Sequence, residues 1–65
     1  MGIVDDLERA VLLDSIEVSR DAIQVFTKLI DSMPSLEAEA TELIFVEQSN
    51  ITKDFQELVS LLRRT

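Results

Sequence analysis

A single proline divides this chain into two long stretches that both show helical apolar periodicity. Pro34 is the only proline in the 65 residues, and the only glycine is Gly2. Proline disfavours a helical conformation at the residue before it and is well tolerated in the first turn of a following helix. The sequence therefore predicts one all-helical domain, residues 1–65, with a helix at about 3–32, a turn at 32–35 and a second helix at about 35–64.

The first stretch carries two adjacent apolar stripes. Residues spaced by three and four positions lie on one side of a helix, and both stripes have this spacing. The stripe through Val11 and Val18 lies beside the stripe through Leu12 and Ile16, so the apolar face is wider than the seam between two helices requires. This helix should have more than one neighbour. Asp14-Ser15 interrupts the pattern; a continuous helix is favoured there, and a kink or a new helix start is the alternative.

The second stretch has the pattern of a coiled-coil seam, with apolar residues at alternating spacings of three and four. One position of this seam is an amide, Gln48. The segment 48–52 contains the weakest helix formers of the stretch, and a break there would give a three-helix bundle in place of a hairpin.

These patterns predict an all-α fold, an antiparallel helical hairpin. A lone hairpin leaves apolar surface along its whole length, and exposed patches of that size mark interfaces, so two copies are expected to form a four-helix bundle. The predicted core seam consists of Val11, Val18, Val25, Phe26 and Leu29 packing against Ile44, Ile51, Phe55, Leu58 and Leu62.

Contacts outside the hairpin are predicted at apolar residues beside the seam, namely Leu12, Phe45 and Val46. Aromatic side chains are enriched at the centres of interfaces, which favours Phe45 in particular. Gln48 is the fourth residue predicted for the protein interface, and it has two interpretations. It fixes the register and the oligomeric state as a polar seam residue, or it lies at a boundary with its amide in water.

The composition predicts no catalytic residues and no cofactor or metal site. The chain has no histidine and no cysteine, and its only glycine cannot form a phosphate-binding loop. A carboxylate pair needs a cleft that a 65-residue hairpin lacks. With thirteen acids, six bases and a net charge of −7, neither nucleic acid nor an anionic membrane surface is an expected partner.

The expected function is therefore binding to protein. The first hypothesis is an interaction subunit that self-associates, with a dimer favoured, or that completes a larger helical assembly. The alternative is an acidic helical inhibitor or chaperone, like an antitoxin or a secretion chaperone, that covers a basic or hydrophobic partner surface. The acidic amino terminus differs from a secretory signal, and no apolar run is long enough to cross a membrane, so a cytoplasmic location is expected.

Overall fold

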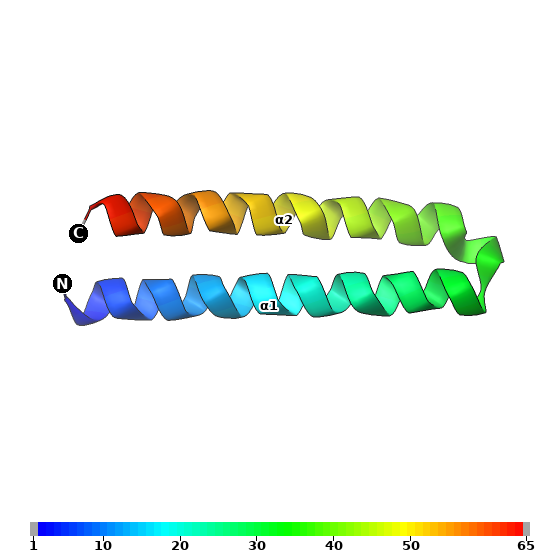
Figure 1. The fold of residues 1–65 in the computed structure, drawn as a ribbon, viewed down its shortest axis with the longest axis horizontal. Helices are drawn as coiled ribbons and strands as arrows, with labels where there is room; N and C mark the ends of the chain where they lie inside the picture. Colours follow the sequence, from blue (N-terminus) through cyan, green and yellow to red (C-terminus); the bar gives the residue numbers. More distant parts are fainter. Residues whose placement is uncertain (1, 65) are drawn as a thin grey trace.

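The computed structural model describes residues 2–64, which form a hairpin of two long helices (Figure 1). Helix α1 spans Ile3–Ser32, a short 3-10 helix, η1, spans Pro34–Leu36, and helix α2 spans Glu37–Arg63. Met1 and Thr65, the two ends of the predicted domain, lie outside the described residues. The predicted all-α class and the helical hairpin are confirmed.

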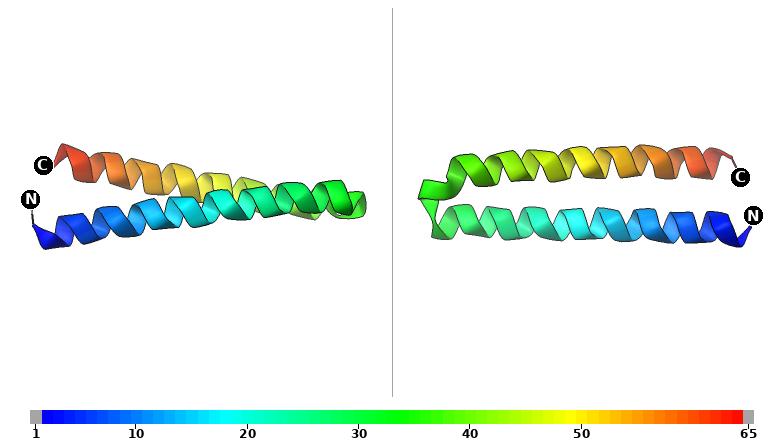
Figure 2. Two further views of the ribbon diagram at one scale, coloured as in Figure 1. Left: turned by 60° about the horizontal axis from the view of Figure 1, so that its bottom comes forward. Right: turned by 180° about the vertical axis from the view of Figure 1, so that it is seen from behind.

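The two helices lie side by side and antiparallel over their whole length, with a shallow crossing (Figures 1 and 2). The first turn of α1 and the last turn of α2 lie at one end of the hairpin, and η1 closes the other end. The molecule measures 49 × 15 × 10 Å. It is thus a rod with a single layer of two helices, and both broad faces of that layer are open.

Proline chemistry sets the position of the turn. The backbone N–H of Met33 donates a hydrogen bond of 2.7 Å to the carbonyl oxygen of Leu29, which closes α1. Pro34 then begins η1, where its fixed φ angle suits a first helical position. The N–H of Leu36 donates to the carbonyl of Met33 at 2.9 Å, and α2 follows without a further break.

The charges at the helix ends agree with the helix dipole at three of the four ends. Asp5 and Asp6 lie in the first turn of α1, and Glu37 and Glu39 lie in the first turn of α2. Arg63 lies in the last turn of α2, whereas the last turn of α1 contains no basic residue.

Both helices are continuous at the two places where the sequence allowed a break. Helix α1 passes through 14–15, and α2 passes through 48–52. In the segment 48–52, two polar side chains bond within α2. Thr52 Oγ1 donates to the carbonyl of Gln48 at 3.0 Å, and Asn50 Nδ2 donates to Glu47 Oε1 at 3.0 Å. These residues therefore have partners without leaving the helix, and the three-helix alternative is not adopted.

The seam between the helices is defined by half-buried and buried residues at spacings of three and four. It contains Leu12, Ile16, Ser19, Ile23, Phe26 and Ile30 of α1 and Ala40, Ile44, Glu47, Ile51, Asp54, Leu58 and Leu61 of α2. Within the described residues, the buried apolar side chains are Ala40, Leu58 and Leu61 alone. The hairpin therefore has a contact line and not a closed core.

On α1 the seam differs from the predicted one. Phe26 lies in the seam and Leu29 is half-buried beside it, but Val11, Val18 and Val25 are 66%, 60% and 62% exposed. The structure uses the adjacent stripe of Leu, Ile and Phe instead. Those larger side chains remove more apolar area from water than valines do.

On α2 only part of the predicted seam faces α1. Two different seams are possible on this helix, and they have Ile44, Ile51 and Leu58 in common. Ile44, Ile51 and Leu58 recur every seven residues and lie in the seam as predicted. The second seam position was predicted four residues after each of them, which gives Gln48, Phe55 and Leu62, and all three are exposed. The structure uses the position three residues later, which gives Glu47, Asp54 and Leu61.

Candidate protein interface

A periodic row of exposed valines runs along α1 beside the seam. Val4, Val11, Val18 and Val25 recur every seven residues, and each side chain is at least 60% exposed. Val11, Val18 and Val25 each directly precede a seam residue in the sequence. A step of one residue turns a helix by about 100°. The row therefore lies on one broad side of the hairpin. We call this row, together with Leu43 and Val46 of α2, the valine face.

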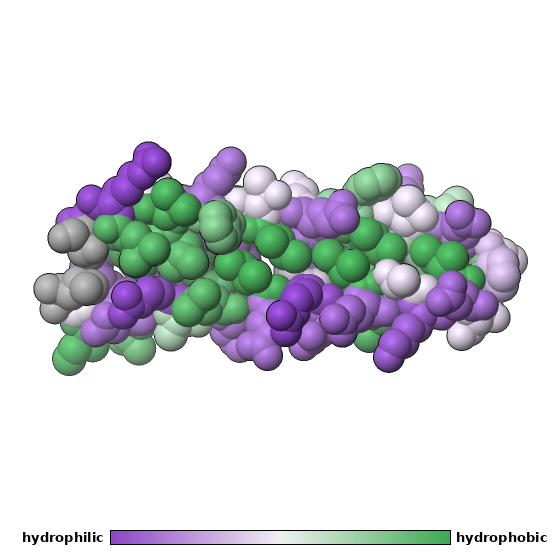
Figure 3. All heavy atoms as spheres, in the orientation of Figure 1, coloured by the Kyte–Doolittle hydropathy of each residue, from purple (hydrophilic) through white to green (hydrophobic). Residues whose placement is uncertain are grey.

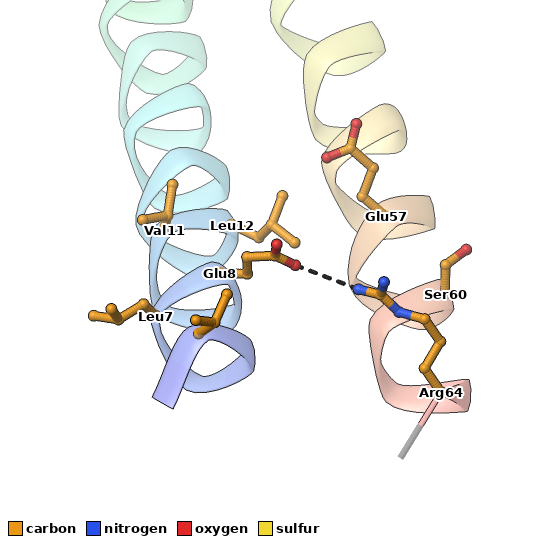
Figure 4. A pocket seen from close by; sticks show the side chains of 8 residues that line it. Leu7, Glu8, Val11, Leu12, Glu57, Ser60 and Arg64 are labelled. Carbon is orange, nitrogen blue, oxygen red and sulfur yellow. Dashed lines mark hydrogen bonds and ion pairs between the residues drawn. The ribbon is translucent and has the colours of Figure 1, made fainter. Parts of the chain in front are cut away.

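An open groove at the end of the hairpin shows how the valine face continues onto α2 (Figure 4). On the α1 side it is lined by Val4, Leu7, Glu8, Val11 and Leu12, and on the α2 side by Glu57, Ser60 and Arg64. Arg64 Nη2 donates to Glu8 Oε2 at 3.3 Å across the groove. Near the chain ends this side of the hairpin is thus apolar on α1 and polar on α2.

A second apolar surface lies on the opposite side of the hairpin. On α2 the residues that follow seam positions include Phe45, Phe55, Val59 and Leu62, and on α1 Leu13 follows Leu12. Glu57 and Ser60, which precede the seam residues Leu58 and Leu61, face the groove, so the residues that follow the seam turn the other way. We call this set the phenylalanine face.

Figure 3 shows the side of the hairpin on which α1 is polar. Apolar side chains gather over α2 and along the line between the helices, and they cover the most area toward the chain ends. Phe45 and Phe55 are 63% and 57% exposed. An exposed aromatic side chain has a large apolar area in water, so both belong to a candidate interface.

The four residues predicted for outside contacts are not brought together by the structure. Leu12 is half-buried in the seam and also lines the groove. Phe45 and Gln48 are exposed and follow the seam residues Ile44 and Glu47, which places them on the phenylalanine side. Val46 precedes Glu47 and lies on the valine face. The predicted single interface is therefore divided between two opposite faces.

The polar part of the seam was missed by the sequence prediction. Ser15 Oγ donates to Asp54 Oδ2 at 2.6 Å, and Ser19 Oγ donates to Glu47 Oε1 at 3.5 Å. Ser19 is buried. The two serines are four residues apart whereas Glu47 and Asp54 are seven apart, so no matching spacing in the sequence indicated these pairs. Hydrophobicity alone favoured Phe55 at the alternative position.

The observed seam leaves exposed some apolar side chains that the alternative seam would have buried. Helix α2 directs Glu47 and Asp54 toward α1 and leaves Phe55 outside. The exposed area of 4952 Å² exceeds the roughly 4,200 Å² expected for a compact monomer of 7.4 kDa. The excess, about 750 Å², is close to the roughly 800 Å² that each partner contributes to a standard protein interface.

Within residues 2–64, no cluster of three or more acidic, histidine or cysteine side chains has the arrangement of a metal site. Neither α1 nor α2 combines the length and the apolar character needed to span a bilayer, as far as the described residues extend. Comparisons of the chain with models of protein families, with curated proteins and with solved structures found no match.

Proposed function

We propose that this chain is a self-associating interaction subunit, and that two copies join through their valine faces to form a four-helix bundle. The exposed valines at positions 4, 11, 18 and 25 are the observation that carries the proposal. A row of β-branched residues at a strict spacing of seven is the pattern by which one helix packs along another.

Helix α1 has the geometry that a bundle helix requires. In a four-helix bundle each helix packs against two neighbours, so it needs two apolar stripes about 90° apart. The seam and the valine row of α1 are displaced by one residue, which is about 100°. Ser15, at the edge of the seam, and Ala22 are small residues next to the valines, and they allow a second helix to approach closely. The proposed role is binding and not catalysis.

A charge placed on the valine face tests the proposal. Val18→Lys introduces a cation that is solvated in the monomer but desolvated in the bundle, once in each copy. We expect the dissociation constant of the dimer to rise at least roughly 100-fold, measured by sedimentation velocity over a concentration series. Circular dichroism on the same samples separates loss of association from loss of helix.

Gln24→Lys is the matched control, because it makes the same change of charge on the same helix but on the polar side. It should leave the mass of the assembly unchanged. Equal weakening by both substitutions would mean that added charge, and not the valine face, controls association, and it would contradict the proposal.

A second candidate function rests on the phenylalanine face and on the net charge of −7. In this function the chain is an acidic binding protein that covers a basic, apolar surface of another protein. The exposed side chains of Phe45 and Phe55 supply the contact. Raised salt would weaken such a complex strongly because charge attraction contributes to it, whereas a bundle held by apolar burial keeps its mass in high salt.

A further inference from the structure

We infer that the two hairpins of the bundle lie with their turns at opposite ends, so that α1 of one copy packs antiparallel on α1 of the other. This inference rests on the proposed function. The other symmetric face-to-face arrangement places both turns at the same end, with α1 of each copy over α2 of the other. Two independent features of the hairpin, its charge distribution and its pattern of apolar residues, distinguish these arrangements.

The charge of the hairpin is concentrated at the turn. Residues 21–50, the half that contains the turn, have six acids and one base, a net charge of −5. The remaining residues have seven acids and five bases, a net charge of −2. Packed helices lie about 8–10 Å apart, which is about one Debye length at physiological salt, so these charges repel across an interface.

With both turns at the same end, the two halves of charge −5 lie together. With the turns at opposite ends, each half of charge −5 lies beside the half that contains Arg20, Lys53, Arg63 and Arg64. The second arrangement separates the strongest like charges and brings cations next to acids. Charge complementarity of this kind fixes the orientation of two partners.

The pattern of apolar residues also favours the arrangement with the turns at opposite ends. The valines keep the same spacing of seven when the order of the helix is reversed. Two antiparallel copies of α1 therefore bring Val11 toward Val18 of the second copy, and Val4 toward Val25. On the α2 side, Asn50, Lys53 and Glu57 then lie near the twofold axis, where polar side chains meet polar side chains.

Near the first turn of α1 and the last turn of α2, the same-end arrangement instead opposes unlike surfaces. Val4 and Val11 share their groove with Glu57, Ser60 and Arg64, which shows that these α2 residues lie at the level of the first valines. A twofold axis parallel to the helices would place the valines of each copy against these polar residues of the other. Glu57 would then lose water without gaining a partner.

The distance between the two turns tests the inference. The chain contains no cysteine, so Ser35→Cys in η1, which is exposed, accepts a single spin label. Double electron–electron resonance on the full-length dimer then measures one distance. With Val11 opposite Val18, the twofold axis passes between residues 14 and 15, about 20 residues from Ser35, so at a rise of 1.5 Å per residue turns at opposite ends give a label separation of roughly 60 Å. Turns at the same end give less than roughly 25 Å.

Sedimentation and circular dichroism of the labelled protein accompany the measurement, so that the possible failures are distinguishable. A separation of roughly 60 Å in a dimeric sample supports the inference. A short separation in a dimeric sample overturns it and leaves the proposed function in place. A monomeric mass without dipolar coupling overturns the proposed function, and the inference with it.

Discussion

The seam and the valine face are two adjacent surfaces of the same hairpin, displaced by one residue in the sequence. Their polarities are the reverse of what is usual for an interior and an exterior. The seam, which is the interior of the hairpin, contains serine, glutamate and aspartate side chains. The valine face, which is exposed, is apolar over most of α1. An interior that includes polar groups favours specificity of register, and an apolar exterior favours association. We therefore propose that the hairpin is one half of a larger assembly.

Truncation of a buried seam residue should have the largest effect on the hairpin. Leu61 is 3% exposed. Leu61→Ala removes buried apolar area and leaves a cavity, which should lower the free energy of unfolding by about 2–3 kcal/mol in urea denaturation at fixed protein concentration. Leu13→Ala, on the exposed side of α1, should cost less than about 1 kcal/mol. Equal effects would show that the seam is not the principal internal contact.

A smaller effect is expected at the polar part of the seam. Ser15→Ala removes the donor to Asp54 and should cost about 1 kcal/mol, measured by thermal and urea unfolding. In the double variant Ser15→Ala with Asp54→Leu, both polar partners are replaced, and most of that loss should be recovered. A double variant much less stable than the single one would mean that Asp54 has another essential partner.

The smallest effect on association is expected on the phenylalanine face. Phe55→Ser lies on the opposite side from the valines, so the dimer should keep its dissociation constant within roughly threefold by sedimentation. Val18→Lys, by comparison, should dissociate it. If Phe55→Ser dissociated the dimer and Val18→Lys did not, the roles of the two faces would be reversed.

The hairpin itself was predictable from the sequence because its signals are local. Pro34 ends one helix and begins the next segment, and the spacing of apolar residues identifies both helices. The seam was only partly predictable. Ile44, Ile51 and Leu58 satisfy two possible seams, and the choice between Asp54 and Phe55 depends on Ser15, which lies 39 residues before Asp54. Long-range partners of this kind have no local signal.

The division of the interface residues was not predictable for a related reason. Phe45 and Val46 are neighbours in the sequence, and both are exposed. They lie on opposite broad sides of the hairpin only because Ile44 and Glu47 both face α1. Once the seam is known, the faces follow from the helical repeat, but an error of one position in the seam moves every face.

The most direct test of the account is sedimentation equilibrium of the unmodified chain, with circular dichroism over the same range of concentrations. The account predicts a dimer whose mass is retained at high salt, and a helix content and melting temperature that rise with protein concentration, because association stabilises the folded state. A fully helical monomer with a melting temperature independent of concentration would contradict it, since the valine face would then be stable in water without a partner.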